Sequence, residues 1–350
     1  MTTPEFIKEP GYTYDLFCLF AMKLNIGTIF SGPLYNFPSE EKTLYLETLD
    51  KFEPVSDDLY VFFHTLNFGK SFMTYHYFNN LLKTNYTDYN LELVMKELQN
   101  DDQVIENAIK YYLHNLSHDE LQECISSKKT LFSAIKASEY SEIEKLRLYE
   151  FFMDPLPYIQ KLRDELMKKN AELSAYYKRY YAQALEKHKD TSTEDIIKLI
   201  SSEGRLDPSE FALKKHFVSL CLVNSVLIYH IWNDDFMINI LGIDYQEYLE
   251  NRKKTIRLDT LGAALSEENR VQMLDFIFEK GEVSRKELEQ HFSVSSSTLY
   301  HHLNTLLCAD ILRTRTKGRV LLYSVNKNYF DNAIEIFRKY SNTPSEEASR

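Results

Sequence analysis

The sequence predicts a mainly α-helical protein with minor β structure: a multi-helix N-terminal domain, a small β segment, and a C-terminal unit of three helices followed by a β hairpin. Helical periodicity dominates residues 56–189, and residues 216–243 are rich in β-branched and aromatic side chains. In the last quarter of the chain, capping and turn signals mark where helices begin and end. We therefore expect one domain over 1–255, a second over 256–340 and a disordered polar tail over 341–350.

The N-terminal domain is predicted to consist of packed helices. Residues 1–57 mix short apolar stretches with turn signals and predict one or two helices, and Ser117-x-x-Glu120 is a capping box that opens a later one. Apolar residues then recur at steps of three and four over 157–189, which predicts one long helix. Asn170 lies within this apolar seam and could fix the register of a coiled coil. We expect the seam to pack against its own domain instead, and assign it no partner.

The β segment is predicted from two runs, HFVSLCLV and VLIYHIW, that are rich in β-branched and aromatic residues. Asn233, Asp234 and Asp235 separate the second run from FMINIL as a hairpin turn would, so we predict a small sheet with a hairpin near 216–243. Short apolar runs do not by themselves distinguish strands from buried helices. A buried helix over 213–232 therefore remains the alternative.

Composition and motif content argue against several classes of protein. With 44% hydrophobic and 27% charged residues, the chain should fold around a substantial core. Its start lacks the pattern of a secretory signal, and no run approaches about 18 apolar residues, so we expect a cytoplasmic protein with no membrane span. Its four cysteines are too scattered for a zinc site, and the common nucleotide-binding and hydrolase motifs are absent. We therefore expect no metal, no cofactor, no catalytic residues and no enzymatic activity.

The charge distribution marks one segment as a candidate nucleic-acid interface. The whole chain carries a formal net charge of −11, which opposes the binding of phosphates. Residues 256–340, however, hold 12 Lys and Arg against 11 Asp and Glu, so the excess acidity lies elsewhere. Within 293–327 five basic residues stand against one acidic residue, a net charge of +4. This segment should carry any contact with DNA.

The first two helices of the C-terminal unit are predicted from their caps. Ser266 stands where an N-cap would begin the first helix, and Gly281 stands where that helix would end. Ser284-x-x-Glu287 is a capping box that opens the second helix. The first helix should bury an apolar face made of Val271, Leu274, Ile277 and Phe278.

The third helix, over 295–309, follows a tight turn and has leucines on one side and polar residues on the other. Strands over 311–316 and 320–325, joined by Lys-Gly-Arg at 317–319, then form a basic hairpin. This is the winged helix-turn-helix arrangement, in which the third helix enters the major groove and the hairpin, or wing, contacts phosphates. His302 is expected to be packed or bound to a phosphate. We assign DNA binding to Ser295, Ser296, Ser297, Thr298, Tyr300, His301, His302, Asn304, Arg313, Arg315, Lys317 and Arg319.

Three short motifs occur within residues 261–325: ALS-x-x-x-R at 264–270, S-x-S-T-x-x-x-H-L at 295–303 and G-R-x-x-x-Y at 318–323. With these motifs the segment resembles the ArsR type of winged-helix regulator. This resemblance implies a homodimer, because in that family the helices that flank the DNA-reading unit form the dimer interface. The matching apolar residues in this chain are Leu258, Leu261, Leu265, Phe330, Ile334 and Phe337.

The chain departs from the metal-sensing members of that family. They carry a Cys-x-Cys before the turn, where this chain has Ser284 and Lys286. The other common metal site lies on the last helix, where Asp331 and Glu335 occur without a histidine. Metal sensing is therefore not expected. Tyr300 also replaces the small polar residue common in the recognition helix, so the operator sequence cannot be transferred.

These observations predict a homodimeric transcriptional regulator that places two recognition helices in successive major grooves of a two-fold symmetric operator. We expect repression, with the N-terminal domain sensing a small-molecule or peptide effector that changes the spacing of the two DNA-binding heads. The alternative is a protein-interaction module whose winged helix binds a protein partner. Salt dependence separates the two, because only DNA binding weakens steeply as salt rises.

Overall fold

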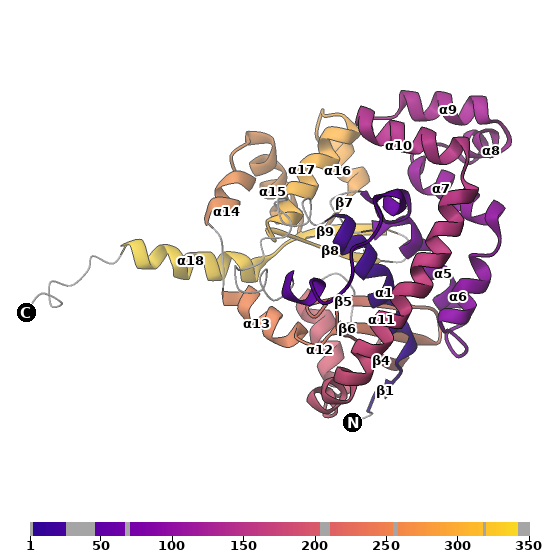
Figure 1. Cartoon of the computed structure of the whole chain (residues 1–350). Helices are drawn as coiled ribbons and strands as arrows, with labels where there is room; N and C mark the ends of the chain where they lie inside the picture. Colours follow the sequence, from indigo (N-terminus) through magenta and orange to yellow (C-terminus); the bar gives the residue numbers. More distant parts are fainter. Residues whose placement is uncertain are drawn as a thin grey trace, which may run out of the picture. The chain divides into compact units, whose positions relative to one another are not determined.

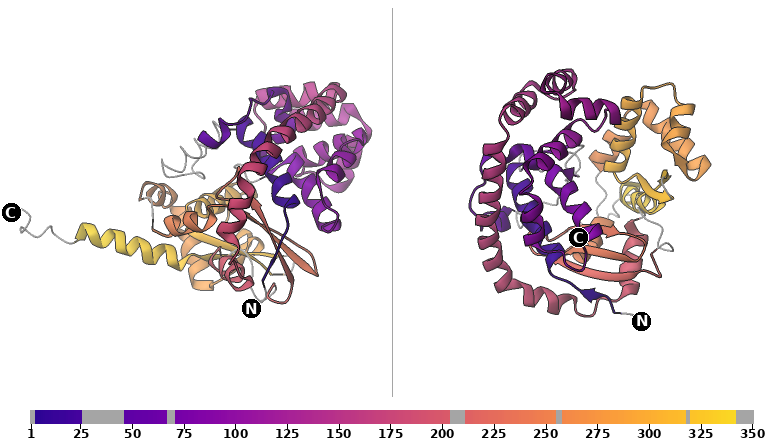
Figure 2. Two further views of the ribbon diagram at one scale, coloured as in Figure 1. Left: turned by 60° about the horizontal axis from the view of Figure 1, so that its bottom comes forward. Right: turned by 90° about the vertical axis from the view of Figure 1, so that its right-hand side faces the viewer.

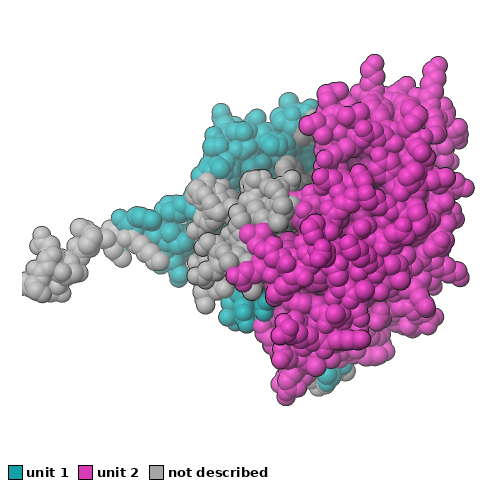
Figure 3. Space-filling view, in the orientation of Figure 1, with its two compact units in different colours: residues 1–3, 191–214, 244–350 teal, residues 4–190, 215–243 magenta. Residues whose placement is uncertain are grey.

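A computed structural model describes most of the chain, which divides into two compact units (Figure 1, Figure 3). The helix-sheet unit comprises residues 4–190 and 215–243, and the winged unit comprises residues 1–3, 191–214 and 244–350. Parts of the winged unit thus come from the region that the sequence analysis assigned to the N-terminal domain. The described residues are 3–25, 46–66, 71–203, 211–254, 258–317 and 320–341.

More of the described helices lie in the helix-sheet unit than in the winged unit, in agreement with the predicted mainly α-helical fold. The elements of the helix-sheet unit are β1 (Glu5–Phe6), α1 (Glu9–Leu24), η1 (Asp57–Leu59), α4 (Tyr60–Phe63), β2 (Thr65–Leu66), β3 (Ser71–Phe72), α5 (Met73–Thr84), α6 (Leu91–Glu97), α7 (Asp101–Tyr112), α8 (His118–Ser126), α9 (Lys128–Ala137), α10 (Glu142–Met153), α11 (Leu156–His188), β4 (Lys215–Cys221), β5 (Ile228–Trp232) and β6 (Phe236–Gly242). The predicted capping box is present, with Ser117 and Glu120 bonding each other at the start of α8.

This unit contains a four-stranded sheet in the order β1-β4-β6-β5. The hairpin prediction is confirmed, because β5 and β6 are antiparallel and the Asn233 side chain accepts the backbone N–H groups of Asp235 and Phe236. The alternative helix over 213–232 is wrong. The sequence did not predict that β4 runs parallel to β6 and that β1 joins β4 in parallel from the start of the chain.

Helix α1 is buried around most of its circumference and carries a buried carboxylate. Asp15 accepts hydrogen bonds from the backbone N–H groups of Leu222, Val223 and Asn224 at 2.5, 2.9 and 3.1 Å. The hydroxyl of Tyr177 on α11 donates a fourth, at 2.7 Å. Burial raises the pKa of Asp15, and these four donors act in the opposite direction by favouring the carboxylate. Asp15 thereby joins α1 to α11 and to the segment after β4.

Helix α11 confirms the prediction of one long helix. It contains 33 residues, about 50 Å at 1.5 Å per residue, and Figure 2 shows it as one uninterrupted ribbon. Its apolar seam packs within the helix-sheet unit, as expected. The hydroxyl of Tyr12 on α1 lies 2.6 Å from Oδ1 of Asn170. The polar residue in the seam thus has a partner in its own unit.

The centre of the winged unit in sequence is formed by three helices, α15, α16 and α17, and a small antiparallel sheet in the order β7-β9-β8. Helices α12, α13 and α14 precede these elements, and α18 follows them. This confirms the winged helix-turn-helix prediction. Its elements are α12 (Thr193–Glu203), α13 (Tyr245–Lys254), α14 (Leu258–Ala264), α15 (Glu268–Lys280), β7 (Val283–Ser284), α16 (Arg285–His291), α17 (Ser296–Cys308), β8 (Leu312–Lys317), β9 (Val320–Val325) and α18 (Lys327–Ser341).

The start of α15 differs from the prediction. The helix begins at Glu268 with Glu267 in the N-cap position, so Ser266 is not the cap. The Ser266 hydroxyl instead donates to the carbonyl oxygen of Ala263 at 2.8 Å. The end of the helix is as predicted, because Gly281 has a φ of 81° that a residue with a Cβ rarely adopts.

The buried face of α15 also differs. Ile277 is fully buried and Leu274 packs against the same core, as predicted, whereas Val271 is 37% exposed and Phe278 is 63% exposed. The buried face instead includes Met273 and Arg270, which is only 4% exposed and occupies the core-facing position one turn before Met273. A pattern built on apolar residues alone cannot anticipate an arginine on the inner face.

Two further expectations lie wholly or partly outside the described residues. The predicted disordered tail falls on residues 342–350 beyond Ser341, and the tip of the wing falls on residues 318–319. Within the described ranges, none of the helices combines the length and the apolar character that crossing a bilayer requires.

Candidate nucleic-acid interface

The turn between α16 and α17 is built by two local caps. Ser284 caps α16 and forms the predicted box with Glu287, whose carboxylate oxygen lies 2.7 Å from both the backbone nitrogen and the hydroxyl oxygen of Ser284. The hydroxyl of Ser295 accepts the backbone N–H of Thr298 at 3.1 Å and so caps α17. These caps satisfy N–H groups that the helices leave free, which fixes where each helix begins.

Buried leucines orient the recognition helix α17. Leu299, Leu303 and Leu306 are at most 2% exposed and join one core with Leu288 of α16 and Ile277 of α15. Their spacing of three and four residues places them on one side of the helix. The opposite side is left available for DNA.

The exposed side of α17 presents fewer residues than the sequence assigned to it. Thr298 and His301 are exposed, and Tyr300 is 38% exposed. The prediction for Asn304 differs from the structure, because this residue is 8% exposed, and His302 is buried at 4%. Helix α17 contacts α15, α16 and β8, so more of its surface is covered than the leucine positions alone indicate. Burial of His302 fits the expectation that it is packed; the side chains of Ser296 and Ser297 lie outside the description.

The wing is an antiparallel pair, β8 and β9, whose register continues to the pair Lys317 and Val320. Arg313 and Arg315 on β8 are both partly exposed. Arg315 pairs with Glu282, a partner that the sequence analysis missed. The side chain of Lys317 and the whole of Arg319 lie outside the described residues.

The residues at the positions where the family's metal sensors bind metal do not form a cluster of metal ligands in the part of the chain that the structure describes. Ser284 caps α16, so its hydroxyl is already engaged with Glu287. Asp331 and Glu335 are exposed on α18. Among the described residues, no three His, Cys, Asp or Glu side chains gather closely enough to hold a metal ion.

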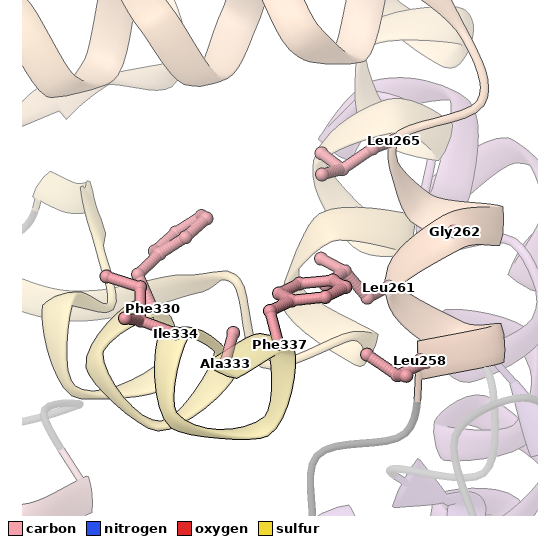
Figure 4. A pocket seen from close by; sticks show the side chains of 8 residues that line it. All are labelled: Leu258, Leu261, Gly262, Leu265, Phe330, Ala333, Ile334 and Phe337. Atoms are coloured by element: carbon pink, nitrogen blue, oxygen red, sulfur yellow. The ribbon is translucent and has the colours of Figure 1, made fainter. Parts of the chain in front are cut away.

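Six apolar residues assigned to a dimer interface come together beside the DNA-reading elements, between α14 and α18. They line a hollow of about 390 Å³, and the Phe337 ring points from α18 toward Leu261 on α14 (Figure 4). Ile334 and Phe337 are each 50% exposed. We call this surface the α14–α18 groove; it is lined by Leu258, Leu261, Gly262, Leu265, Phe330, Ala333, Ile334 and Phe337.

Comparison with known proteins agrees with this geometry. Residues 267–314 match the family described as bacterial regulatory protein, arsR family. The transcriptional repressor SdpR of Bacillus subtilis (strain 168) is 28% identical over 79 residues, which cover 23% of this chain and 87% of the relative. The arsenical resistance operon repressor of Staphylococcus xylosus is 32% identical over 74 residues, 21% of this chain and 70% of the relative.

The corresponding repressor of Staphylococcus aureus is 32% identical over 78 residues, 22% of this chain and 74% of the relative. No solved structure matches the chain. The similarity to curated relatives is thus confined to the winged unit, but it covers more than two thirds of each relative. The chain belongs to the arsR family of bacterial regulatory proteins.

Proposed function

We propose that this DNA-binding transcriptional regulator is a homodimeric repressor of the cytosol, without enzymatic activity, that binds a two-fold symmetric operator. The observation that carries the proposal is the α14–α18 groove, an apolar surface next to a recognition helix with an exposed polar side. The curated relatives are named as repressors, which supports the sign of regulation.

A second copy of the chain is the occupant that we propose for the groove. The groove exposes Ile334 and Phe337 to half of their full extent, and a contiguous apolar surface of this kind usually marks an interaction site. In a two-fold dimer the same surface meets itself, so one apolar groove suffices for both subunits. The two α17 helices would then enter successive major grooves, about 34 Å apart.

Substitution in the groove tests the dimer. Phe337→Asp places a charge in the proposed interface, whereas Asn328→Asp adds the same charge at an exposed position of α18 outside it. Sedimentation should show a dimer for the original chain and for Asn328→Asp, and a monomer with weakened DNA binding for Phe337→Asp. A Phe337→Asp protein that stays dimeric would contradict this interface.

Binding to DNA is tested by a salt series with the full chain, its own upstream intergenic DNA and random DNA of equal length. Specific binding should be tighter than random binding, and both should weaken steeply as salt rises because phosphate contacts release counterions. Weak binding without preference or salt dependence would favour the rival function, a winged helix that binds a protein.

We further propose that the helix-sheet unit senses an effector and passes the signal through α13. Ile243 is the last residue of this unit. Its backbone N–H donates to the carbonyl oxygen of Cys221 at 3.1 Å, and its own carbonyl oxygen lies 2.8 Å from Nε2 of His188. Helix α13 begins two residues later, at Tyr245, and packs against α18. A shift at Ile243 would therefore reach the helix that carries Phe337.

Comparison of the full chain with the fragment 256–350 tests the sensing role, once circular dichroism shows that the fragment is folded. Compounds that raise the melting temperature of the full chain are screened for release of its operator. The proposal expects such a compound to leave the operator affinity of the fragment unchanged. Identical affinity and identical response in the two proteins would contradict it.

A further inference from the structure

Arg270 is buried at the start of α15 and holds the end of α14. Its Nε donates to the carbonyl oxygen of Ala264 at 2.6 Å, and one terminal nitrogen donates to the carbonyl oxygen of Ala263 at 2.9 Å and the hydroxyl of Ser266 at 3.1 Å. Carbonyl groups in the last turn of a helix have no partner within the helix. Arg270 supplies that partner, so the end of α14 is fixed to α15.

Glu267 faces two elements at once. It occupies the N-cap position of α15, yet its side chain makes no capping hydrogen bond. One carboxylate oxygen lies 2.8 Å from Arg270, and the other lies 3.5 Å from Nδ1 of His302 on α17. A residue in this position would ordinarily turn back to the helix N–H groups. Here the carboxylate instead lies between Arg270, on the same helix, and His302 on the recognition helix.

His302 is the contact of this carboxylate on α17. It is 4% exposed, and among the described residues neither ring nitrogen makes a hydrogen bond. The charged and titratable groups that act on it are Glu267 and Arg270 from α15 and His301 from α17. Burial lowers the pKa of His302, as do Arg270 and His301, while Glu267 opposes them. His302 lies on the same helix as the exposed residues Tyr300 and His301, so a movement of the His302 side chain that turns α17 also changes the direction in which these exposed residues point.

We infer that Glu267 is a positioning residue that couples α14, through Arg270 and His302, to the orientation of the recognition helix α17. The inference rests on the proposed dimer, because α14 provides Leu258, Leu261 and Leu265 to the groove. Contact with a second subunit that shifts α14 also moves Arg270, and the shared carboxylate transmits the movement to His302. Dimer formation and operator binding would then strengthen each other.

The test uses the full chain and measures the dimer dissociation constant with and without operator DNA. Glu267→Gln removes the carboxylate charge that pairs with Arg270 and lies beside the ring of His302. Glu268→Gln is the matched control, since Glu268 is the next residue, is exposed, and accepts a hydrogen bond from the Gln272 side chain on the same helix. We expect DNA to strengthen the dimer at least about fivefold in the original chain and in Glu268→Gln, and to lose most of this effect in Glu267→Gln.

A second variant keeps the test decisive if Glu267→Gln impairs folding, which a thermal melt reports. His302→Gln should reduce the same effect, and the double variant should lose no more than either single variant, because coupled residues are not additive. If DNA strengthens the Glu267→Gln dimer as much as the original one, or if the losses of the two single variants add in the double variant, the coupling is overturned and the proposed dimer is not. No strengthening in the original chain overturns the coupling together with the proposed dimeric function.

Discussion

Arg315 on β8 donates two hydrogen bonds to the carboxylate of Glu282, from Nε at 2.5 Å and from a terminal nitrogen at 2.6 Å. The two donors that form the fork of the guanidinium are therefore occupied within the protein. A DNA phosphate that binds an arginine through two hydrogen bonds uses the same kind of fork. Glu282 is thus placed to compete with phosphate for Arg315.

Replacement of Glu282 by Gln should raise DNA affinity. The change removes the charged partner that holds the Arg315 fork, and one additional phosphate contact should increase affinity for operator and random DNA alike, by about threefold to tenfold at low salt. The salt slope should steepen by about one unit, measured by fluorescence anisotropy across a salt series. Glu289→Gln, which removes an exposed carboxylate paired with Arg285 on α16, is the control. Equal or lower affinity in Glu282→Gln would mean that the carboxylate orients Arg315 and does not compete for it.

The exposed side of α17 should carry sequence preference. His301 is exposed there, so His301→Ala should weaken operator binding by about 1–3 kcal/mol and affect random DNA much less. Competition binding with operator and random duplexes measures the difference. His118→Ala, at an exposed position of α8, should leave both affinities unchanged. Equal losses for the two duplexes would assign His301 to phosphate contact.

His302 should make the stability of the protein depend on pH. Burial lowers its pKa below the ordinary value of 6.5, so below pH 6.5 the unfolded chain binds a proton that the folded chain does not. The free energy of unfolding should therefore fall as pH falls through this range, by at most about 1.4 kcal/mol per pH unit for one histidine.

Urea denaturation between pH 7.5 and pH 5 measures this dependence. His302→Gln should flatten the slope, while His301→Gln, which changes the exposed neighbour, should keep it. The same slope in both variants would show that His302 does not contribute to it.

Two glycines should respond in opposite ways to alanine. A Cβ at Gly242 would lie 2.2 Å from the backbone of Ser225, so Gly242→Ala should destabilise the protein by about 3 kcal/mol. A Cβ at Gly262, within α14, would meet nothing within 4 Å among the described residues of its own subunit. In the Phe337→Asp background, where no second copy covers the groove, Gly262→Ala should therefore stabilise by about 1 kcal/mol because alanine favours the helix. Denaturation midpoints check both signs. A tolerated Gly242→Ala would require the 224–225 segment to move.

The features that local sequence determines were predictable. The boxes formed by Ser117 with Glu120 and by Ser284 with Glu287 involve residues three apart, and Asn233 forms its turn with its immediate neighbours. Such contacts form in the same way wherever the segment lies in the fold, so the spacing alone identifies them.

The features that depend on tertiary packing were not predictable. Asn304 is polar, and only the neighbours of α17 reveal that it is buried. Phe278 is apolar and largely exposed, because it follows Ile277 and so lies about 100° around α15 from the buried face that Arg270, Met273 and Ile277 form. The six groove residues were identified from family resemblance, and the structure brings them together.

The parallel pairing of β1 with β4 has a consequence for the order of folding. Phe6 pairs with Val218, and Asp15 bonds to Leu222, so the first strand and helix meet partners more than 200 residues later in the chain. Closing such long-range contacts is slow, whereas the winged helix-turn-helix forms from segments close in sequence. Helices α4, α5 and α11, which also pack against α1, are synthesised earlier, but on the ribosome the face of α1 that meets β4 must remain uncovered until β4 has been synthesised. During that interval the uncovered face of α1 is a site for chaperone binding or aggregation.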